Sequence, residues 1–420
     1  MTSEHVDPGS VRDGTSERAD PASVRDGTSE LIDPGLTHGE TLGAPYAVTI
    51  VAHHVGSVGG MERIITELAL GLRRRGHAVT VIAYACDLPA DAGVAFHRVR
   101  GPSRPFVLSY PWFMLAGTLA VRRWRHGIVQ ATGAIVLNRV DFIEIQYCQQ
   151  VGPATPSRSS LPFRLNAKVA GLLGRIAERV CFRVNRPWRF VCASEGVAEE
   201  IREYFPRLAQ RVVTVQNGVD IDAFAPGSRS EDAHALRAQL QLDSERLLAI
   251  FVGSEWDRKG LAPVIQALAL ARDWDLLVVG NGDRERYQQL ARAADVEQAV
   301  HWFGVSRDVA PLYQLADAFV FPSSYEAFPL VALEAAASGL PILATPVNGV
   351  RELVQEGENG FLISREPSVI GARLNELAAD PQLRTRLGAA ARRSALEYSW
   401  EKMVTRHDGL FASRATRGCR

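Results

Sequence analysis

The chain has 420 residues, 46% of them hydrophobic and 22% charged, which predicts a globular protein with two domains. Its 47 basic and 47 acidic residues cancel, so net charge gives no reason to expect a nucleic-acid partner. The five cysteines are far apart and lack the spacing of metal-binding or redox pairs, which predicts reduced thiols in a cytoplasmic protein. The polar N-terminus predicts that there is no signal peptide.

The first 44 residues differ in composition from the rest of the chain. The sequence VRDGTSE occurs twice there, inside a 13-residue repeat rich in Asp, Pro, Gly and Ser. Such a segment has few large apolar side chains to offset the entropy lost on ordering. We therefore expect residues 1–44 to be a disordered tail, either a linker or the product of a start codon placed too early, in preference to a binding module.

A strand–helix–strand unit follows the tail. Residues 46–52 form a short apolar run rich in β-branched residues, which is typical of a buried parallel strand. A loop ending in Gly59 and Gly60 comes next, then an amphipathic helix closed by Gly76, then a second apolar strand. The paired glycines allow a phosphate or sugar to approach the backbone closely, or they form a plain tight turn.

Two later segments have a pattern that bears on membranes. Residues 105–121 are uncharged, but 17 residues with an internal proline fall short of the ~20 that a spanning helix needs, so we expect a buried helix. The flanking arginines leave a membrane-surface role open. Residues 161–189 carry seven basic residues and one acidic residue, and a helical wheel separates basic positions from apolar ones. The basic positions are Arg164, Lys168, Arg175, Arg179 and Arg183, and the apolar ones are Leu165, Val169, Leu173, Ile176 and Val180. This pattern predicts either a helix on an anionic membrane or a surface helix with a solvated face.

The second half of the chain repeats the alternation of strands and helices, which implies parallel sheets. A turn-rich stretch at residues 215–232 separates the two halves. The predicted fold class is α/β, with two Rossmann-like, doubly wound domains that face each other across a cleft. We place the domains at 45–215 and 216–395, and expect residues 396–420 to form a last helix that crosses back to the first domain, followed by a tail.

The stretch SSYEAFPLVALEAAASGLPILATPV, residues 323–347, combines a strand end, a turn and a helix start. Phe328 precedes a proline and should be extended, and Pro329 suits the first helical turn. The free backbone N–H groups of Leu330 and Val331 would then form an anion site. Glu326 precedes this helix end, and Glu334 lies about 7 Å beyond it along the helix. Carboxylates that accept hydrogen bonds from hydroxyls, on either side of a phosphate site, suit a ligand with sugar, diphosphate and ribose.

Several segments in order resemble the retaining nucleotide-sugar glycosyltransferases of family 4, which share the GT-B fold. The stretch above resembles the family's E-x7-E motif. The others are GGMERIITELALGLRRRGHAVTV, VQNGVDIDAFAP, FVGSEWDRKGL, VVGNGD, HWFGV and YSWEKM. The resemblance extends from about residue 46 to residue 412. It implies a metal-independent hexosyltransferase that uses a UDP- or GDP-linked sugar, no further cofactor, and a glycan, lipid-linked or small-molecule acceptor.

The resemblance also implies roles for individual residues. Glu326 would bind the transferred sugar, Glu334 the ribose, and Arg258 with Lys259 the diphosphate, so that Glu326, Arg258 and Lys259 form the catalytic group. Val305 would meet the base through its backbone. The remaining donor-binding positions are Gly59, Gly60, Gly253, Gly280, Asn281, Gly282, Phe328, Pro329, Leu330 and Val331. Without the resemblance, Arg258 and Lys259 would read as a solvated turn, and residues 280–282 as a β-turn.

One position departs from the family pattern. Many members have a pattern like V-H-F-C-H here, in which this chain has Gln146 and Gln149 at the matching positions, and glutamine cannot carry a proton or a positive charge. We therefore expect a sugar or acceptor contact at Gln146 without acid–base chemistry. His53 and His54 follow the first strand, and either one of them faces the cleft, with His54 the candidate sugar or acceptor contact, or both are structural.

No metal site is expected. Asp220 with Asp222, and Asp273 with Asp275, form D-x-D pairs, but the first belongs to the linker and the second to a helix-to-strand turn. Two other readings remain: a non-catalytic sugar-nucleotide-binding partner, and a sugar-nucleotide epimerase or phosphorylase on the same fold. The expected location is the cytoplasm, with residues 161–189 a candidate contact with the inner membrane face.

Overall fold

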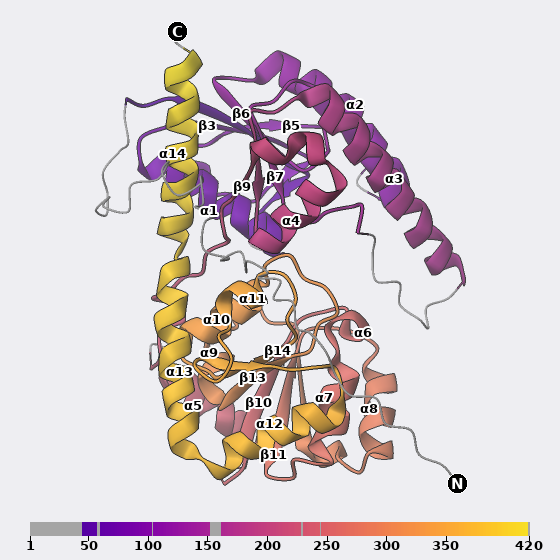
Figure 1. Cartoon of the computed structure of the whole chain (residues 1–420), viewed down its shortest axis with the longest axis vertical. Coiled ribbons are helices and arrows are strands. Elements are labelled where there is room, and N and C mark those ends of the chain that lie inside the picture. The colour runs from indigo at the N-terminus through magenta and orange to yellow at the C-terminus, as the bar shows by residue number, and fades with distance from the viewer. Residues whose placement is uncertain are drawn as a thin grey trace, which may run out of the picture. The chain divides into compact units, whose positions relative to one another are not determined.

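The computed structural model describes residues 44–56, 59–102, 104–151, 161–227, 230–243 and 245–418, with the backbone alone at 161–167, 230, 234, 417 and 418. The predicted tail, apart from residue 44, lies outside the described residues, as do Cys419 and the side chains of Arg164 and Leu165. The described chain contains two large parallel β-sheets with helices on their faces (Figure 1).

The first sheet has seven strands in the order β5-β3-β1-β6-β7-β8-β9, all parallel. Its strands are β1 (Ala47–Val51), β3 (Ala78–Ala83), β5 (Ala95–Arg98), β6 (Ile128–Thr132), β7 (Phe142–Ile145), β8 (Arg189–Cys192) and β9 (Val212–Thr214). A separate parallel pair joins β2 (His54–Val55) to β4 (Ala85–Cys86). The strand order reverses between β1 and β6, so this is the switch point at which a doubly wound sheet binds ligands.

The second sheet has six parallel strands in the order β12-β11-β10-β13-β14-β15. They are β10 (Leu247–Val252), β11 (Trp274–Val279), β12 (Val300–Gly304), β13 (Ala318–Phe321), β14 (Ile342–Ala344) and β15 (Gly360–Leu362). The inner strands are buried along nearly their whole length because helices cover both faces. Here the order reverses between β10 and β13.

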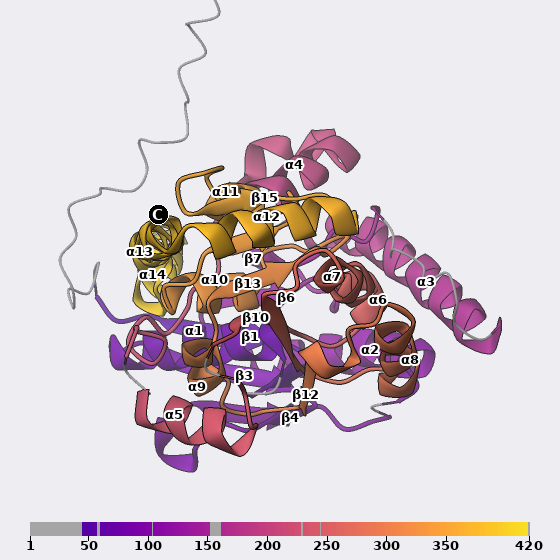
Figure 2. The ribbon, with the colours of Figure 1, turned by 90° about the horizontal axis from the view of Figure 1, so that it is seen from below.

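The helices are packed on both faces of each sheet. The first half contains α1 (Gly60–Arg74), α2 (Phe106–Trp124), α3 (Leu161–Asn185) and α4 (Glu195–Tyr204), with the 3-10 segments η2 (Ala90–Ala92) and η3 (Pro206–Arg211). The second half contains α5 (Ser230–Gln239), α6 (Trp256–Lys259), α7 (Leu261–Leu268), α8 (Arg284–Ala293), α9 (Ala310–Leu315), α10 (Leu330–Ala337), α11 (Val350–Leu353), α12 (Pro367–Ala379) and α13 (Pro381–Ala395), with η4 (Glu297–Ala299) and η5 (Leu396–Tyr398). The last helix is α14 (Trp400–Gly418). In the second half, α5 packs against α9 and α12 packs against α7. Figure 2 shows these two pairs of helices apart from each other.

The C-terminal helix α14 packs on α1, next to the first sheet (Figure 1). Val404 and Phe411 of α14 belong to the same buried cluster as the apolar face of α1. Gly71 makes this approach possible, because a Cβ there would lie 2.9 Å from Cγ1 of Val404. A buried ion pair of 2.9 Å between Arg75 and Asp408 adds a polar contact to the same interface.

The expectation of a buried helix at residues 105–121 is wrong. Helix α2 buries one face, which includes Phe113, but its other face is open to solvent. Leu108, Leu115 and Leu119 are 60%, 62% and 64% exposed. An uncharged run reads the same whether its apolar side chains face a core or the outside, so sequence alone did not separate the two cases. Among the described residues, no helix is both long enough and apolar enough to cross a bilayer.

Candidate functional site

The residues predicted to bind the donor meet at the switch point of the second sheet. The loop after β10 carries Gly253 to Lys259, and the loop after β13 carries Ser323 to Glu326. Because β10 and β13 are parallel neighbours, both loops leave the same edge of the sheet. The first loop turns at once into the four-residue helix α6. Gly253 there has φ of 146°, and a Cβ on it would lie 2.6 Å from Cδ of Lys259. Only glycine allows the lysine stem to lie so close to the backbone.

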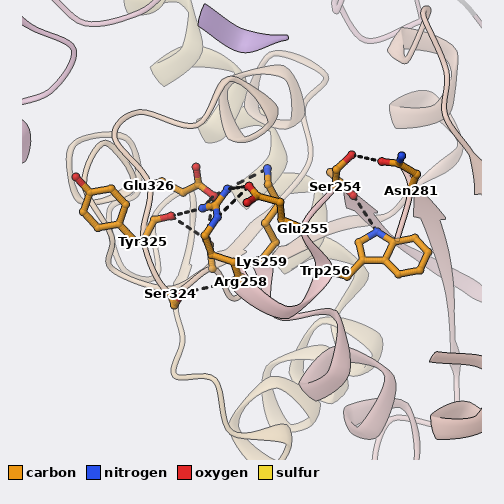
Figure 3. A network of polar contacts seen from close by, with 11 residues as sticks. Ser254, Glu255, Trp256, Arg258, Lys259, Asn281, Ser324, Tyr325 and Glu326 are labelled. Carbon is orange, nitrogen blue, oxygen red and sulfur yellow. Dashed lines mark hydrogen bonds and ion pairs between the residues drawn. The ribbon is translucent and has the colours of Figure 1, made fainter. Parts of the chain in front are cut away.

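The first polar group of the site is a cluster of Arg258, Lys259 and Glu326 (Figure 3). Nη1 of Arg258 donates to Oε1 of Glu326 at 2.9 Å, and Nζ of Lys259 lies 3.9 Å from the same oxygen. The hydroxyl of Ser323 also donates to Oε1, at 2.9 Å. Within the described chain, no side chain or backbone group bonds to Oε2. One carboxylate oxygen is therefore held by the protein and the other can accept from a ligand.

The two cations of this cluster differ in their surroundings. The side chain of Lys259 is 14% exposed and its ammonium lies 4.9 Å from the ring centroid of Phe321. Burial lowers the pKa of Lys259, against the opposing effect of Glu326. Burial also acts on Arg258, but there Glu326 and Glu255 outweigh it and raise the pKa of the guanidinium. These contacts differ from those of a solvated turn and place two positive charges beside one carboxylate.

Glu334, the second glutamate of the motif, lies on α10 and is 5% exposed. Nη1 of Arg63 donates to Oε1 at 3.0 Å, and the Tyr313 hydroxyl donates to Oε2 at 3.1 Å. Burial raises the pKa of Glu334, with Arg63 acting in the opposite sense. From the sequence alone a ligand is the expected partner of this carboxylate. The structure shows that Arg63 and Tyr313 already donate hydrogen bonds to it and that Arg63 also compensates its charge. A carboxylate has about four acceptor positions, so hydroxyls can still bind.

Two helix N-termini lie close together beside these glutamates. Helix α10 begins at Leu330 with Pro329 as its N-cap, and no side chain caps it. Helix α1 begins at Gly60 with Gly59, at φ of 100°, as its N-cap. A Cβ on Gly60 would lie 3.6 Å from Cδ1 of Leu330, so the two ends are neighbours. Uncapped N–H groups and the positive ends of two helix dipoles favour an anion. Val331 follows in the first turn of α10, where the sequence predicts a free N–H group.

The other predicted donor residues follow the neighbouring strands. A Cβ on Gly280, after β11, would lie 2.6 Å from the carbonyl carbon of Gly253, so the two loops touch through their backbones. Asn281 accepts a hydrogen bond of 2.5 Å from the Ser254 hydroxyl (Figure 3), and Gly282 packs against Trp256. Val305, after β12, is 70% exposed.

Gln146, which replaces the family's histidine, connects the first sheet to the donor loop. Its amide donates to Oε1 of the buried Glu144 at 2.8 Å and exchanges two hydrogen bonds of 3.2 Å with Asn217. Asn217 in turn donates to the carbonyl of Phe328 at 3.3 Å. Gln149 does not join this chain of contacts, since its backbone N–H bonds to Glu178 instead. Only the first of the two glutamines thus reaches the donor side.

Three partners of the predicted residues were missed from the sequence: Arg63, Tyr313 and Asn217. Arg63 lies in GGMER and Asn217 in the linker VQNGVD, two segments that were recognised for their glycines and their order. The position of Arg63 just after a helix start and that of Asn217 in the linker were the sequence signals from which their roles could have been predicted. Tyr313 carries no such signal, because its role depends on the packing of α9 against α10.

A cavity of about 970 Å³ lies at the switch point of the first sheet. It is lined by His53, His54, Met61, Glu62, Ile65, Tyr84, Arg104, Pro105, Phe106, Ser109 and Thr132. Both histidines therefore face it. Burial lowers the pKa of His53 to about 4, so its imidazole is neutral at pH 7. Among the described residues its Nε2 atom has no hydrogen-bond partner, although it is buried.

One aspartate of each D-x-D pair has other partners. The carboxylate of Asp275 accepts from Nε of Arg246 at 2.6 Å and pairs with Nε2 of His301 at 2.8 Å. Asp220 accepts a backbone hydrogen bond from Asp222 at 3.2 Å. No group of three or more metal-ligating side chains occurs within the described part of the chain.

Two doubly wound sheets, with a cationic loop and an acidic motif at the switch point of the second, define the class of GT-B nucleotide-sugar glycosyltransferases. Residues 58–223 match the family model Glycosyltransferase Family 4, and residues 232–394 match Glycosyl transferases group 1. A D-inositol 3-phosphate glycosyltransferase from Salinispora arenicola is 32% identical, over 83% of this chain and 86% of the relative. One from Thermomonospora curvata is 30% identical, over 84% and 90%. The chain belongs to glycosyltransferase family 4 and is a retaining enzyme that transfers a sugar from a nucleotide sugar.

Solved structures agree on the fold. The lipopolysaccharide glycosyltransferase WaaG has a TM-score of 0.73 at 19% identity, covering 87% of this chain and 99% of its own. Anabaena HepE, solved in complex with UDP-glucose, has a TM-score of 0.68 at 19% identity, covering 88% and 100%. At this identity the likeness concerns the fold alone. The predicted family and the predicted fold class are both confirmed.

Proposed function

We propose that this enzyme moves a hexose from a UDP- or GDP-linked donor to a glycan, lipid-linked or small-molecule acceptor. The observation that carries this proposal is the cluster of Arg258, Lys259 and Glu326 at the switch point of the second sheet. It combines two cations for a diphosphate with a carboxylate for sugar hydroxyls. The uncapped N-termini of α1 and α10 supply further N–H donors for the phosphates.

In the proposed reaction Arg258 and Lys259 stabilise the charge that develops on the departing nucleotide diphosphate. Glu326 binds hydroxyls of the transferred sugar through Oε2, while Oε1 keeps its contacts with Arg258 and Ser323. Glu334 binds the ribose through acceptor positions that Arg63 and Tyr313 leave open. The acceptor hydroxyl attacks from the face that the leaving phosphate occupies, and the phosphate oxygen takes its proton.

We propose that no metal ion takes part. Arg258 and Lys259 provide the positive charge that a cation would otherwise supply to the diphosphate, and one aspartate of each D-x-D pair, Asp275 and Asp220, has other partners. The expected result is that transfer continues in excess EDTA at the rate seen with added magnesium or manganese. A loss of activity that either metal restores would contradict this part of the proposal.

The acceptor belongs, on this proposal, in the cavity of the first sheet. Arg104 and the two histidines give it polar groups, and Tyr84 and Phe106 give it aromatic walls. Since several relatives are named D-inositol 3-phosphate glycosyltransferase, a phosphorylated inositol is the first small-molecule acceptor to test. We place the reaction in the cytoplasm, in keeping with four described cysteines that form no disulfide.

The test is a panel of UDP- and GDP-sugars, measured by thermal shift and calorimetry on the wild type, Glu326→Ala and Glu255→Ala. Glu255 is a matched control, because it pairs with the same Arg258 at 2.8 Å but is exposed and has no proposed sugar contact. We expect the wild type to prefer one sugar, and Glu326→Ala to lose that preference while keeping affinity for the free nucleotide. Glu255→Ala should keep the preference.

Product analysis separates the remaining readings. Transfer with retained anomeric configuration, followed by NMR, supports the proposal. Conversion of the nucleotide sugar into its epimer, without acceptor, would indicate an epimerase. Gln146 in place of histidine is the observation that favours the non-catalytic reading, and donor binding without any turnover would support that reading.

A further inference from the structure

Exposed apolar side chains are concentrated on two neighbouring helices. Of the seventeen large hydrophobic residues that are exposed in the described part of the chain, five lie on α2 and five on α3. They are Phe106, Leu108, Trp112, Leu115 and Leu119 on α2, and Val169, Leu172, Ile176, Val180 and Val184 on α3. Apart from Phe106, which lies on the opposite side of α2, the spacing of three or four residues puts each set on one stripe of its helix. Scattered exposed apolar residues need no explanation, but two adjacent stripes do.

The two stripes point to the same side of the molecule. Helices α2 and α3 contact each other and lie side by side in Figure 1. Their opposite faces, with Phe113 on α2 and Phe182 on α3, pack in one buried cluster against the first sheet. The exposed stripes therefore face away from that sheet together. We call this surface the α2–α3 face, defined by the nine residues above other than Phe106.

The same region is strongly basic. There is no acidic residue from position 92 to 140, and Glu178 is the only one from 145 to 194. Glu178 is buried and accepts hydrogen bonds from residues 149 and 150, so it offers little negative charge at the surface. The exposed basic residues on α2 and α3 and directly beside their ends are Arg104, Arg122, Arg123, Arg125, Lys168, Arg179, Arg183 and Arg186. Within the described residues none of them forms an ion pair.

We propose that the α2–α3 face docks on a bilayer that contains anionic lipid. The apolar stripes would enter the boundary between headgroups and acyl chains, and the basic residues would lie among the headgroups. Charge complementarity favours this occupant over a second copy of the chain, because a symmetric contact would bring two basic surfaces together. The docking extends beyond the proposed function and does not depend on it.

The position of the acceptor cavity fits such docking. Arg104, Phe106 and Ser109, at the start of α2, line the cavity, and Arg104 is also one of the exposed basic residues that would lie among the headgroups. A molecule docked by this face therefore holds the cavity beside the lipid headgroups. A sugar acceptor carried on a lipid would be within reach without leaving the bilayer.

The test is flotation of the full chain with vesicles at 150 mM salt. One set is phosphatidylcholine alone, and the other contains phosphatidylglycerol. The first variant, Leu115→Gln with Leu119→Gln, alters exposed side chains and should fold normally, and Leu270→Gln is its control, with an exposed leucine on the other half of the chain. The second, Arg122→Glu with Arg183→Glu, reverses two charges. Its control is Arg393→Glu, at an exposed position on α13.

We expect the wild type to float only with anionic vesicles. Each basic residue near an anionic surface contributes about fivefold to the partition coefficient, so Arg122→Glu with Arg183→Glu should lower it at least ~30-fold. The leucine variant should also float poorly, and both controls should float like the wild type. The proposal is overturned if the wild type does not float, or if it floats equally with both vesicles. It is also overturned if sedimentation shows a dimer in solution that the leucine variant abolishes.

Discussion

Lys259 allows an unusual prediction, because the same side chain should cost stability and support catalysis. We expect Lys259→Met to leave folding unchanged or improve it while turnover falls. Methionine keeps most of the length of the lysine stem, which lies against Gly253, and removes the charge. A buried charge replaced by an apolar side chain of similar volume is often neutral or stabilising.

The magnitude follows from the contacts. At 3.9 Å from Glu326, the attraction is about 4 kcal/mol at an effective dielectric constant of 20, and the burial of the ammonium opposes it. Glu326 keeps its 2.9 Å contact with Arg258, so no carboxylate is left alone. We therefore expect the free energy of unfolding to change by less than about 1 kcal/mol, or to rise. Loss of a preorganised charge from the diphosphate should lower turnover by about 100- to 1000-fold.

The pH dependence follows from the lowered pKa of Lys259. Between that pKa and the ordinary value of 10.5, the unfolded chain binds more protons than the folded one, so the free energy of unfolding rises with pH. The destabilisation is fully present below the folded pKa and disappears as pH rises toward 10.5. Relative to the wild type, Lys259→Met should therefore gain most below the folded pKa of Lys259 and less as pH rises toward 10.5.

Urea denaturation at several pH values and initial rates of transfer, with the donor found in the panel, measure both effects. Lys402→Met is the control, since Lys402 is a partly exposed lysine on α14 whose ion pair with Glu397 should contribute little. A variant at Lys259 that loses more than ~2 kcal/mol of stability and keeps turnover within threefold would show that this lysine is structural.

Three further changes test the site and its supports. Gly71→Ala should lower the free energy of unfolding in urea by about 1–3 kcal/mol, because the added methyl meets Val404. The double variant Gly71→Ala with Val404→Ala should lose less stability than the sum of the two single variants. A double-variant loss equal to that sum would mean that α14 does not pack tightly against Gly71. Glu334→Gln should weaken UDP and UMP about tenfold and equally in calorimetry, since both contain the ribose, whereas a loss with UDP alone would indicate a phosphate effect. Gln146→His should change the preference among sugars or the turnover number without lowering UDP affinity more than about threefold, and an effect on UDP binding alone would place Gln146 outside the sugar and acceptor site.

The repeated strand–helix pattern was enough to predict two parallel sheets, because apolar runs bounded by glycines mark buried strands without knowledge of their partners. The order of strands around a switch point then brings the loops after β10 and β13 together. Arg258 and Glu326 are 68 positions apart in the sequence, yet their contact follows from that topology. Local motif spacing and a general rule of sheet topology are thus enough to predict much of the candidate site.

What the sequence did not reveal depends on contacts between elements with no fixed spacing. Arg63 reaches Glu334 across 271 positions, and this pairing requires the N-terminus of α1 to lie beside α10. The exposed stripe of α2 was missed for a related reason, since apolar residues such as Leu115 give the same periodicity whether a core or a membrane covers them. An apolar period in the sequence indicates that one face of a helix will be covered, but what covers it depends on the tertiary structure.

The acidic motif is held from both halves of the chain. Arg63 binds Glu334, Asn217 binds the carbonyl of Phe328, and Glu200 of α4 accepts a 3.0 Å hydrogen bond from the Tyr325 hydroxyl. On the proposed binding mode a nucleotide sugar shares the Glu334 carboxylate with Arg63, and we expect donor binding to change the energy of this contact. By linkage, the factor by which a bound donor changes the equilibrium of this contact equals the factor by which forming the contact changes donor affinity. In the proposed site the second sheet supplies the groups for the donor, and the contacts from the first half determine how far these groups are already hydrogen-bonded before the donor binds.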